Sequence, residues 1–215
     1  MLTHILLASA VFVAVEPATC PDGFKLFQRE PSARNNHTKE WCLGVFYLNG
    51  DLAIRDVARS MCATHHSSLS IPENQIEAEY LFGQNHSGYG IAMDGEISNE
   101  CKNKISENNW NNKKFIDIAG PCNLRRNLFH FESPNSNPHF IKMHADPNIP
   151  SELFTVSTKG TNDKAYFFQS CATLRREDKN YWFFATFCMG DRTERPKWAE
   201  KLNMTTVVCG RHPVK

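Results

Sequence analysis

The chain has 215 residues, of which 41% are hydrophobic and 22% are charged, so a packed core is expected and a disordered chain is excluded. Its 24 lysines and arginines nearly balance its 23 aspartates and glutamates, which leaves a formal net charge of +1. Without an excess of positive charge, neither a nucleic acid nor an acidic membrane surface is an expected partner.

The N-terminus begins with an apolar run from Ile5 to Val15, which has the length of a signal-peptide core and is too short to span a bilayer. We interpret residues 1–18 as a signal peptide, cleaved between Ala14 and Thr19. The alternative is a short buried strand or helix at a true N-terminus. No later segment is long enough to span a membrane, and the polar tail after Cys209 lacks the hydrophobic end of a GPI signal. The sequence therefore predicts a secreted, extracellular protein.

The first half of the remaining chain carries strand signals followed by helix signals. Strand-forming residues occupy 25–28 and 41–47, with a polar stretch between them. Asp51 is a candidate N-cap for a first helix. Apolar residues then recur at three- and four-residue spacing, which predicts one buried helix face that includes a cysteine: Ile54, Val57, Ala58, Met61 and Cys62.

A second helix is predicted to begin after Asn74. Glu77, three residues later, completes a capping-box pattern. Ile76, Tyr80 and Leu81 are the expected buried stripe of this helix. A short strand is predicted over residues 90–93.

The second half is mostly polar and irregular. Residues 96–150 are rich in Asn, Pro and Ser, a composition typical of a long loop that is either functional or disordered. Strand signals return at 166–174 and 181–189, joined by a charged turn, and again at 205–209. The aromatic run at 181–184 is interpreted as buried sheet core, with an exposed ligand platform as the alternative.

The even number of cysteines in an exported chain predicts four disulfides, and their spacing alone leaves the pairing open. Zinc is the competing use, but the chain has no close Cys-x-x-Cys pair. The eight cysteines are Cys20, Cys42, Cys62, Cys101, Cys122, Cys171, Cys188 and Cys209. Three N-x-[ST] sequons, at Asn36, Asn85 and Asn203, agree with a glycosylating compartment and are predicted N-glycosylation sites.

Several of these segments together resemble the C-type lectin-like domain. The resemblance is carried by WCLGVF at 41–46, the helix that ends at Cys62, SIPENQIEAEYL at 70–81, IAMDGE at 91–96 and VVCG at 207–210. It implies an α+β fold with two helices, small antiparallel sheets and a long irregular loop region, and it implies one such domain over residues 20–213. The similarity covers nearly all of that range and is weakest between residues 107 and 166.

The resemblance also implies a disulfide pairing. In the family, the cysteine of the first helix bonds the last cysteine, which pairs Cys62 with Cys209. The two sheet cysteines, Cys171 and Cys188, pair with each other, and the long form of the domain adds a bridge from Cys20 to Cys42. Cys101 and Cys122 remain for an additional loop bridge.

Many members of the family bind calcium in the long loop, where the ion contacts sugar hydroxyls directly. The tripeptide Asp146-Pro147-Asn148 stands where the family has its calcium-binding loop motif, and Glu152 is a further candidate metal ligand. The family's Trp-Asn-Asp group on the following strand is replaced here by Phe183, Phe184 and Ala185, which offer calcium no side-chain oxygen. Because calcium takes six to eight oxygen ligands, an ordinary turn is the preferred interpretation and calcium binding remains the alternative.

No catalytic motif stands out. The chain lacks G-x-S-x-G and H-E-x-x-H, and the even cysteine count leaves no thiol over as a nucleophile. The histidines at 65, 66, 130, 139 and 144 are interpreted as non-catalytic. We therefore expect a recognition protein and not an enzyme, with carbohydrate as the ligand class that the resemblance implies and a defence role as its setting. The alternatives are a calcium-independent protein-binding module, a matrix or structural module, and a secreted enzyme inhibitor.

Overall fold

The structure is a computed structural model, and it describes residues 17–48, 55–84, 91–101, 127, 129–144, 169–177, 180–188 and 205–214. In 169–177 and 180–188 the description covers the backbone only. Residues 1–16 of the predicted signal peptide, Asp51, Ile54 and the asparagines of the sequons at Asn85 and Asn203 lie outside the described residues. None of the helices within these ranges has the length and apolar character that a membrane crossing requires.

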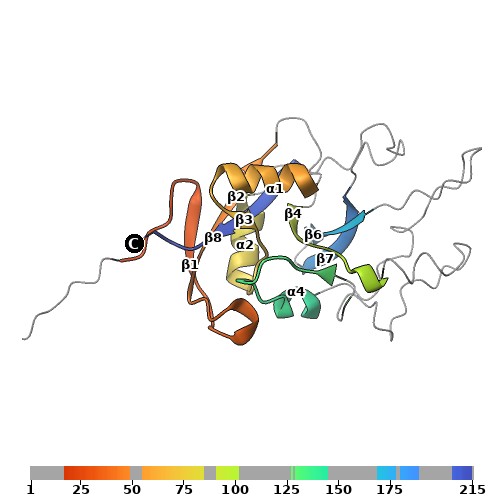
Figure 1. Cartoon of the computed structure of the whole chain (residues 1–215), viewed down its shortest axis with the longest axis horizontal. Helices are drawn as coiled ribbons and strands as arrows, with labels where there is room; N and C mark the ends of the chain where they lie inside the picture. The colour runs from red at the N-terminus through yellow and green to blue at the C-terminus, as the bar shows by residue number, and fades with distance from the viewer. Residues whose placement is uncertain are drawn as a thin grey trace, which may run out of the picture.

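Eight strands form one sheet in the described part of the chain (Figure 1). Along its main path the sheet has the order β1-β2-β8-β4-β6-β7, while β3 pairs with β8 and β5 pairs with β4. The strands are β1 (Phe24–Gln28), β2 (Glu40–Tyr47), β3 (Ser68–Leu69), β4 (Ile91–Ile97), β5 (Phe129–His130), β6 (Gln169–Glu177), β7 (Asn180–Cys188) and β8 (Thr206–Arg211).

The described residues have the expected α+β fold with two main helices, and the strands form one mixed sheet where small antiparallel sheets were expected. All pairings among the named strands are antiparallel except that of β4 with β8, where Ala92 lies opposite Val207 in parallel register. This one pairing joins β1, β2, β3 and β8 to β4, β5, β6 and β7. It therefore makes one continuous sheet out of what the sequence suggested were separate ones.

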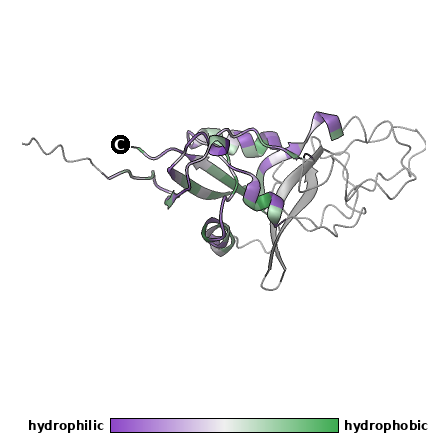
Figure 2. Ribbon diagram, turned by 90° about the horizontal axis from the view of Figure 1, so that it is seen from below, coloured by the Kyte–Doolittle hydropathy of each residue, from purple (hydrophilic) through white to green (hydrophobic). Residues whose placement is uncertain are grey.

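The helices are α1 (Arg55–Thr64), α2 (Gln75–Gln84) and the short α4 (His139–Met143), with a 3-10 turn, η1 (Ala33–Asn35), between β1 and β2. α1 and α2 pack on opposite faces of the sheet, and Figure 2 shows the hydrophobic strands between them. This arrangement follows from the alternation of side chains along β8. Val208 joins the core on the α2 side with Leu81, whereas Val207 and Cys209 join the core on the α1 side.

The prediction of the two helices was partly right. α1 buries Ala58 and Cys62, but Val57 is exposed. α2 begins where predicted, because the Asn74 side chain accepts a hydrogen bond from the Glu77 backbone N–H at 2.9 Å. Its predicted stripe was wrong at Ile76, which is 70% exposed, while Glu77 is fully buried in its place.

Some elements extend beyond their predicted bounds. The predicted charged turn between the last long strands is largely strand, since β6 continues to Glu177 and β7 begins at Asn180. The region expected to be irregular contains the helix α4 and the strand β5. Both are short, and neither has a periodic sequence long enough to have been recognised.

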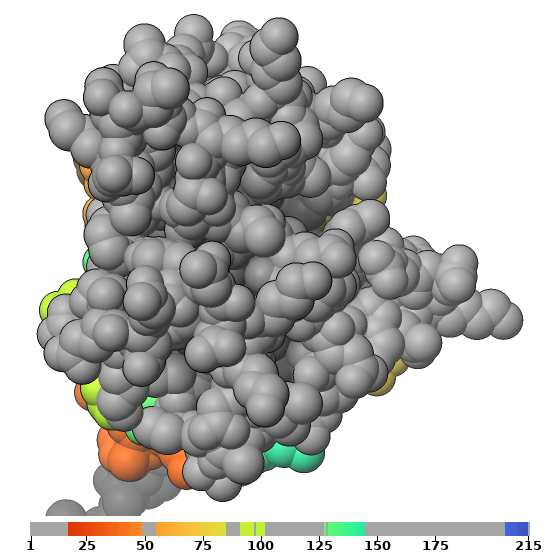
Figure 3. Space-filling view, turned by 90° about the vertical axis from the view of Figure 1, so that its right-hand side faces the viewer, coloured from red at the N-terminus to blue at the C-terminus, as the bar shows by residue number. Residues whose placement is uncertain are grey.

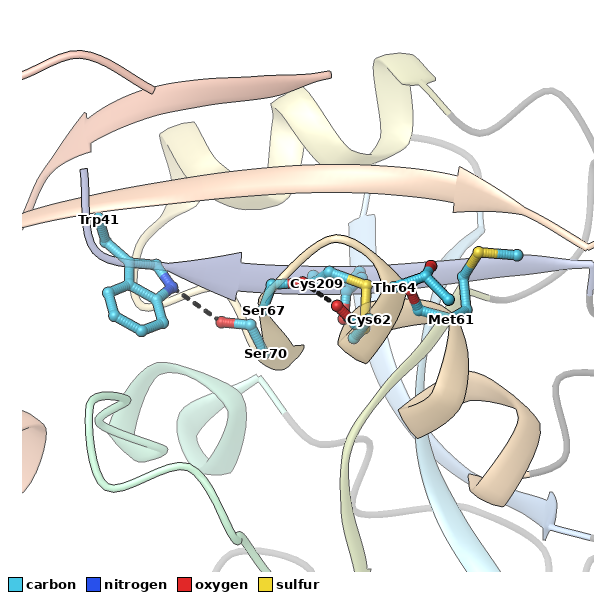
Figure 4. The surroundings of a disulfide bond; sticks show 8 residues. Trp41, Met61, Cys62, Thr64, Ser67, Ser70 and Cys209 are labelled. Atoms are coloured by element: carbon cyan, nitrogen blue, oxygen red, sulfur yellow. Dashed lines mark hydrogen bonds between the residues drawn. A yellow bond between two sulfur atoms is a disulfide. The ribbon is translucent and has the colours of Figure 1, made fainter. Parts of the chain in front are cut away.

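Two disulfides connect distant parts of this frame. Cys20 bonds Cys42 with Cα atoms 5.7 Å apart, and Cys62 bonds Cys209 with Cα atoms 5.3 Å apart, so the structure contains both of these implied bridges. Figure 4 shows how the second bridge fastens α1 to β8. Beside it, the Trp41 indole N–H donates to the Ser70 hydroxyl at 3.0 Å, which satisfies the polar atom of a fully buried ring.

Candidate functional site

The residues predicted to bind a ligand lie outside the described residues. They are Asp146, Pro147, Asn148 and Glu152, which fall between α4 and β6 in the sequence. What the structure describes is the frame on either side of them. We therefore build the site from the segment that leads into it, residues 132–137, and from the side chains that hold this segment.

Arg29, the residue after β1, is the centre of a first buried polar cluster. Its Nε and Nη2 donate to the two carboxylate oxygens of Glu77 at 2.8 and 2.9 Å. Nη1 donates to Glu73 at 3.1 Å and to the backbone oxygen of Asn135 at 3.0 Å, and Nη2 also reaches the Ile71 carbonyl at 3.0 Å. A buried guanidinium needs this degree of pairing, because an unpaired charge in the interior is costly.

Glu73 extends this cluster in two directions. One carboxylate oxygen accepts the backbone N–H of Asn137 at 2.7 Å, and the other accepts the side-chain amide of the buried Asn35 at 3.0 Å. Burial raises the pKa of Glu73, although the charge of Arg29 and the bonds from Asn137 and Asn35 oppose the rise. The cluster thus binds the backbone of 132–137 at two points, Asn135 and Asn137.

Arg55, at the start of α1, organises a second cluster. Its Nη2 donates to the fully buried Asp94 at 3.0 Å and lies 3.3 Å from Glu132, while its Nε lies 3.5 Å from Glu96. Arg59, one turn later on α1, forms further hydrogen bonds to Glu132 and Asp56. Asp94 also accepts the backbone N–H of Ser133 at 2.8 Å, which gives the segment a third point of attachment.

The pKa values of two carboxylates in this second cluster are shifted in opposite directions. Burial raises the pKa of Asp94, against the opposing effects of the Ser133 N–H and Arg55. For Glu132 burial acts in the same direction, but the hydrogen bond from Arg59 and the charges of Arg55 and Arg59 outweigh it, so the pKa of Glu132 is lowered. The hydrogen bond that Arg59 donates to Glu132 is also the main cause that raises the pKa of Arg59.

The two clusters together hold the backbone of residues 132–137 in place. The segment carries two buried serines, Ser133 and Ser136. Its backbone is paired with the side chains of Arg29, Glu73 and Asp94 rather than with another strand. Among the described residues, no group of three His, Cys, Asp or Glu is arranged to hold a metal ion. The carboxylates gathered here face arginines and accept backbone N–H groups, so the arrangement positions the backbone of this segment.

The remaining cysteines are described in part. Cys101 is buried and disulfide-bonded. Its predicted partner Cys122 lies outside the described residues. Cys171 in β6 lies opposite Thr186, and Cys188 in β7 lies opposite Gln169. The backbone register therefore puts Cys171 and Cys188 at diagonal positions on one face of the strand pair, and their bridge remains a prediction.

The family of the chain is settled by sequence comparison. A family model described as Clec-141-158, C-type lectin domain-containing protein 141/158, matches residues 26–212. The chain belongs to this family. C-type lectin domain proteins are generally non-enzymatic. A curated relative, C-type lectin domain-containing protein 158 of Caenorhabditis elegans, is 24% identical over 221 residues, which cover 96% of this chain and 97% of the relative.

Solved C-type lectin domains are similar to this chain at low sequence identity. The C-type lectin domain of murine dendritic cell inhibitory receptor 2, solved in complex with an N-glycan, is 12% identical with a TM-score of 0.39, covering 90% of this chain and 99% of the other. The carbohydrate-recognition domain of human scavenger receptor C-type lectin is also 12% identical, with a TM-score of 0.42 and the same coverage.

Sequence reasoning did not identify the arginines at the centres of the two clusters. Arg29 follows a short strand and Arg55 begins a helix, and both positions are ordinary places for an exposed charge. One signal did exist in α2. Glu77 comes four residues before Leu81, so both side chains lie on the same buried face of the helix. A glutamate in a buried phase requires a partner, but nothing local to the sequence identifies Arg29 as that partner.

Proposed function

We propose that this protein is a secreted recognition protein that binds carbohydrate through the chain between α4 and β6. Membership of the C-type lectin domain family supports the ligand class. The disulfides support an oxidising, extracellular setting, because such bonds persist in secreted proteins. A defence role, in which the glycans belong to microbes, is part of the same proposal.

The observation that carries this proposal is the attachment of residues 132–137. Buried carboxylates and a buried guanidinium bind this backbone at Ser133, Asn135 and Asn137, shortly before the predicted ligand-binding residues. Such pairing is costly to break once it is removed from water. A segment without sheet partners is thereby held in one position, as recognition by a loop on a rigid frame requires.

Calcium does not fit the residues at hand as a complete site. Phe183, Phe184 and Ala185 lie within β7, and none of these side chains carries an oxygen. Asp146, Asn148 and Glu152 alone fall short of the six to eight oxygen ligands that calcium takes. We therefore propose carbohydrate recognition that does not depend on a full calcium shell, and we assign calcium no step in it.

A binding experiment with the full, oxidised chain tests the function. The protein is applied to an array of animal and microbial glycans, with and without EDTA, and calcium is titrated separately by calorimetry. We expect glycan binding that EDTA leaves unchanged and no saturable heat with calcium. Binding that EDTA abolishes, together with a saturable calcium signal, would contradict the calcium-independent form of the proposal.

Variants locate the binding region. Asn148→Ala and Glu152→Ala should lower glycan binding, whereas Asp22→Ala, an exposed carboxylate near the N-terminus, should leave it unchanged. If the well-folded protein bound no glycan on the array but bound an extracellular protein, the protein-binding alternative would replace this proposal.

A further inference from the structure

We propose that Asn36 is an N-glycosylation site that is modified before the turn around it folds. The enzyme that would modify this site is the oligosaccharide-transferring enzyme of the secretory pathway, which uses a lipid diphosphate-linked oligosaccharide as its donor. The inference is independent of what the predicted loop binds. It depends on the turn formed by residues 32–38, where the side chains of one sequon lie in very different surroundings.

This turn is anchored from the inside by Asn35. The fully buried Asn35 side chain accepts the Ser32 backbone N–H at 2.8 Å and donates to the Glu30 carbonyl at 3.0 Å. It also donates to Glu73 at 3.0 Å, which ties the turn to the cluster around Arg29. The next two residues, Asn36 and His37, have φ values of 53° and 55°, and this left-handed backbone turns them outward.

Asn36 is therefore exposed next to the segment 132–137. Its side-chain Nδ2 donates to the Asn135 side-chain oxygen at 3.4 Å. Figure 1 shows the turn between β1 and β2 at the same lower end of the molecule as α4, and Figure 3 shows coloured parts of the N-terminal strands and of α4 along the lower margin. Asn36 is exposed, and the glycosylated amide keeps one hydrogen for Asn135.

Thr38, the third residue of the sequon, is in the opposite situation. It is 4% exposed, and its hydroxyl oxygen is buried with no hydrogen-bond partner among the described residues. A buried hydroxyl without a partner destabilises the folded state relative to an apolar group of the same shape. Valine would fill about the same space, so the hydroxyl makes no favourable contact with the described residues of the folded turn.

The hydroxyl is needed, however, for glycosylation. The acceptor sequence requires serine or threonine at this position, so the enzyme must reach both the Asn36 amide and the Thr38 hydroxyl. In the folded turn the amide is accessible and the hydroxyl is not. The acceptor state is therefore the open turn, which places the modification before folding.

The reaction balances without any further reagent. Nδ2 of Asn36 attacks C1 of the first sugar, and the bond from C1 to the lipid diphosphate oxygen breaks. The lipid diphosphate leaves with the electron pair of that bond, and one amide proton passes to solvent. The product is a β-amide-linked oligosaccharide on Asn36.

The test compares two forms of the full chain as acceptors. Purified oligosaccharyltransferase and a lipid diphosphate-linked oligosaccharide are given the oxidised, folded protein or the reduced, unfolded protein, and occupancy at Asn36 is measured by peptide mass spectrometry. Because the folded turn reacts only through its open population, we expect at least about tenfold less modification of the folded form. Equal occupancy in the two forms would overturn the order of events. No occupancy of the unfolded form would overturn the site.

Variants test the role of the hydroxyl. Thr38→Val should abolish modification of the unfolded chain while the folded protein keeps or raises its unfolding temperature. Thr38→Ser should retain modification, and Asn36→Gln should abolish it without altering a buried position. If Thr38→Val lowered the unfolding temperature or prevented folding, the hydroxyl would contribute to the fold and the argument from its burial would be wrong.

Discussion

Arg29 and Glu77 form a buried, two-point ion pair that joins the end of β1 to the first turn of α2. Their nitrogen and oxygen atoms lie 2.8 and 2.9 Å apart in two parallel hydrogen bonds, and both side chains are fully removed from water. This geometry is specific to arginine, whose planar group matches a carboxylate at two atoms. The pair explains why α2 turns Glu77 inward and leaves Ile76 in solvent.

Removing the cation from this pair should be strongly destabilising. Arg29→Met leaves two buried carboxylates, Glu73 and Glu77, without the cation that they share, and we expect a loss of about 3–5 kcal/mol in the free energy of unfolding. Denaturant unfolding measures the loss. The double variant Arg29→Met/Glu77→Met should recover part of the lost stability, since it also removes the unpaired charge of Glu77. Lys39→Met, at an exposed position, is the control and should change stability little.

The double variant decides between two explanations. If Arg29→Met and the double variant were equally unstable, the loss would come from packing or from the bonds of Arg29 to backbone carbonyls. A recovery of stability would assign it to the uncompensated charge.

The two described disulfides should differ in what they contribute. Cys62–Cys209 closes a separation of 147 residues and Cys20–Cys42 one of 22. In the chain-entropy model these separations correspond to about 5 and about 3 kcal/mol, because a longer loop restricts the unfolded chain more. Replacing each pair by alanines and comparing unfolding in urea tests the order. Equal losses would show that native-state contacts, rather than loop length, set the contribution.

Gly210 in β8 should tolerate no side chain. A Cβ atom there would clash with the indole nitrogen of Trp41 and lie 2.6 Å from the hydroxyl oxygen of Ser70, and both residues are buried. We expect Gly210→Ala to cost about 1–3 kcal/mol and to break the hydrogen bond between Trp41 and Ser70. Unfolding measures the first effect, and a shift in tryptophan fluorescence reports the second.

Gly83 in α2 is the matched control, because a Cβ atom there would have nothing within 4 Å. In a helix, alanine is favoured over glycine by up to about 1 kcal/mol, so Gly83→Ala should stabilise the protein. A destabilised Gly83→Ala, or an unchanged Gly210→Ala, would show that the packing around β8 differs from the one described here.

Local signals were sufficient for much of the fold. The strands β1, β2 and β8 and the start of α2 were predicted, because strand-forming composition and helix-capping patterns depend on residues that are close together in the sequence. The inward turn of Glu77 was not predicted, because its partner Arg29 lies 48 residues away. The parallel pairing of β4 with β8 was missed for the same reason, since the contact between Ala92 and Val207 spans most of the chain. The candidate loop was predicted by resemblance alone. The polar clusters that hold residues 132–137 were not predicted, because their members are far apart in the sequence and form no local pattern.

Glu132 and Asp94 should contribute with opposite signs to the dependence of folding stability on pH. The folded-state pKa of Glu132 is lowered, so its contribution to stability is present above the unfolded pKa and is lost as the pH falls through the folded value. Glu132→Gln should therefore destabilise the protein at neutral pH, and the difference from wild type should shrink on acidification. Because Glu132 is partly exposed, the effect at neutral pH should be about 1 kcal/mol or less.

The stability that is linked to Asp94 should change with pH in the opposite direction. Its folded-state pKa is raised by burial, so the stability linked to its proton is present below the unfolded pKa and is lost as the pH rises through the folded value. Asp94→Asn keeps an oxygen that can accept the Ser133 N–H and removes the titration, so it should flatten that part of the pH profile. Chemical unfolding of wild type and both variants between acid and neutral pH measures the two slopes. If Glu132→Gln and Asp94→Asn changed the profile in the same direction, the arginines of α1 would not distinguish the two carboxylates.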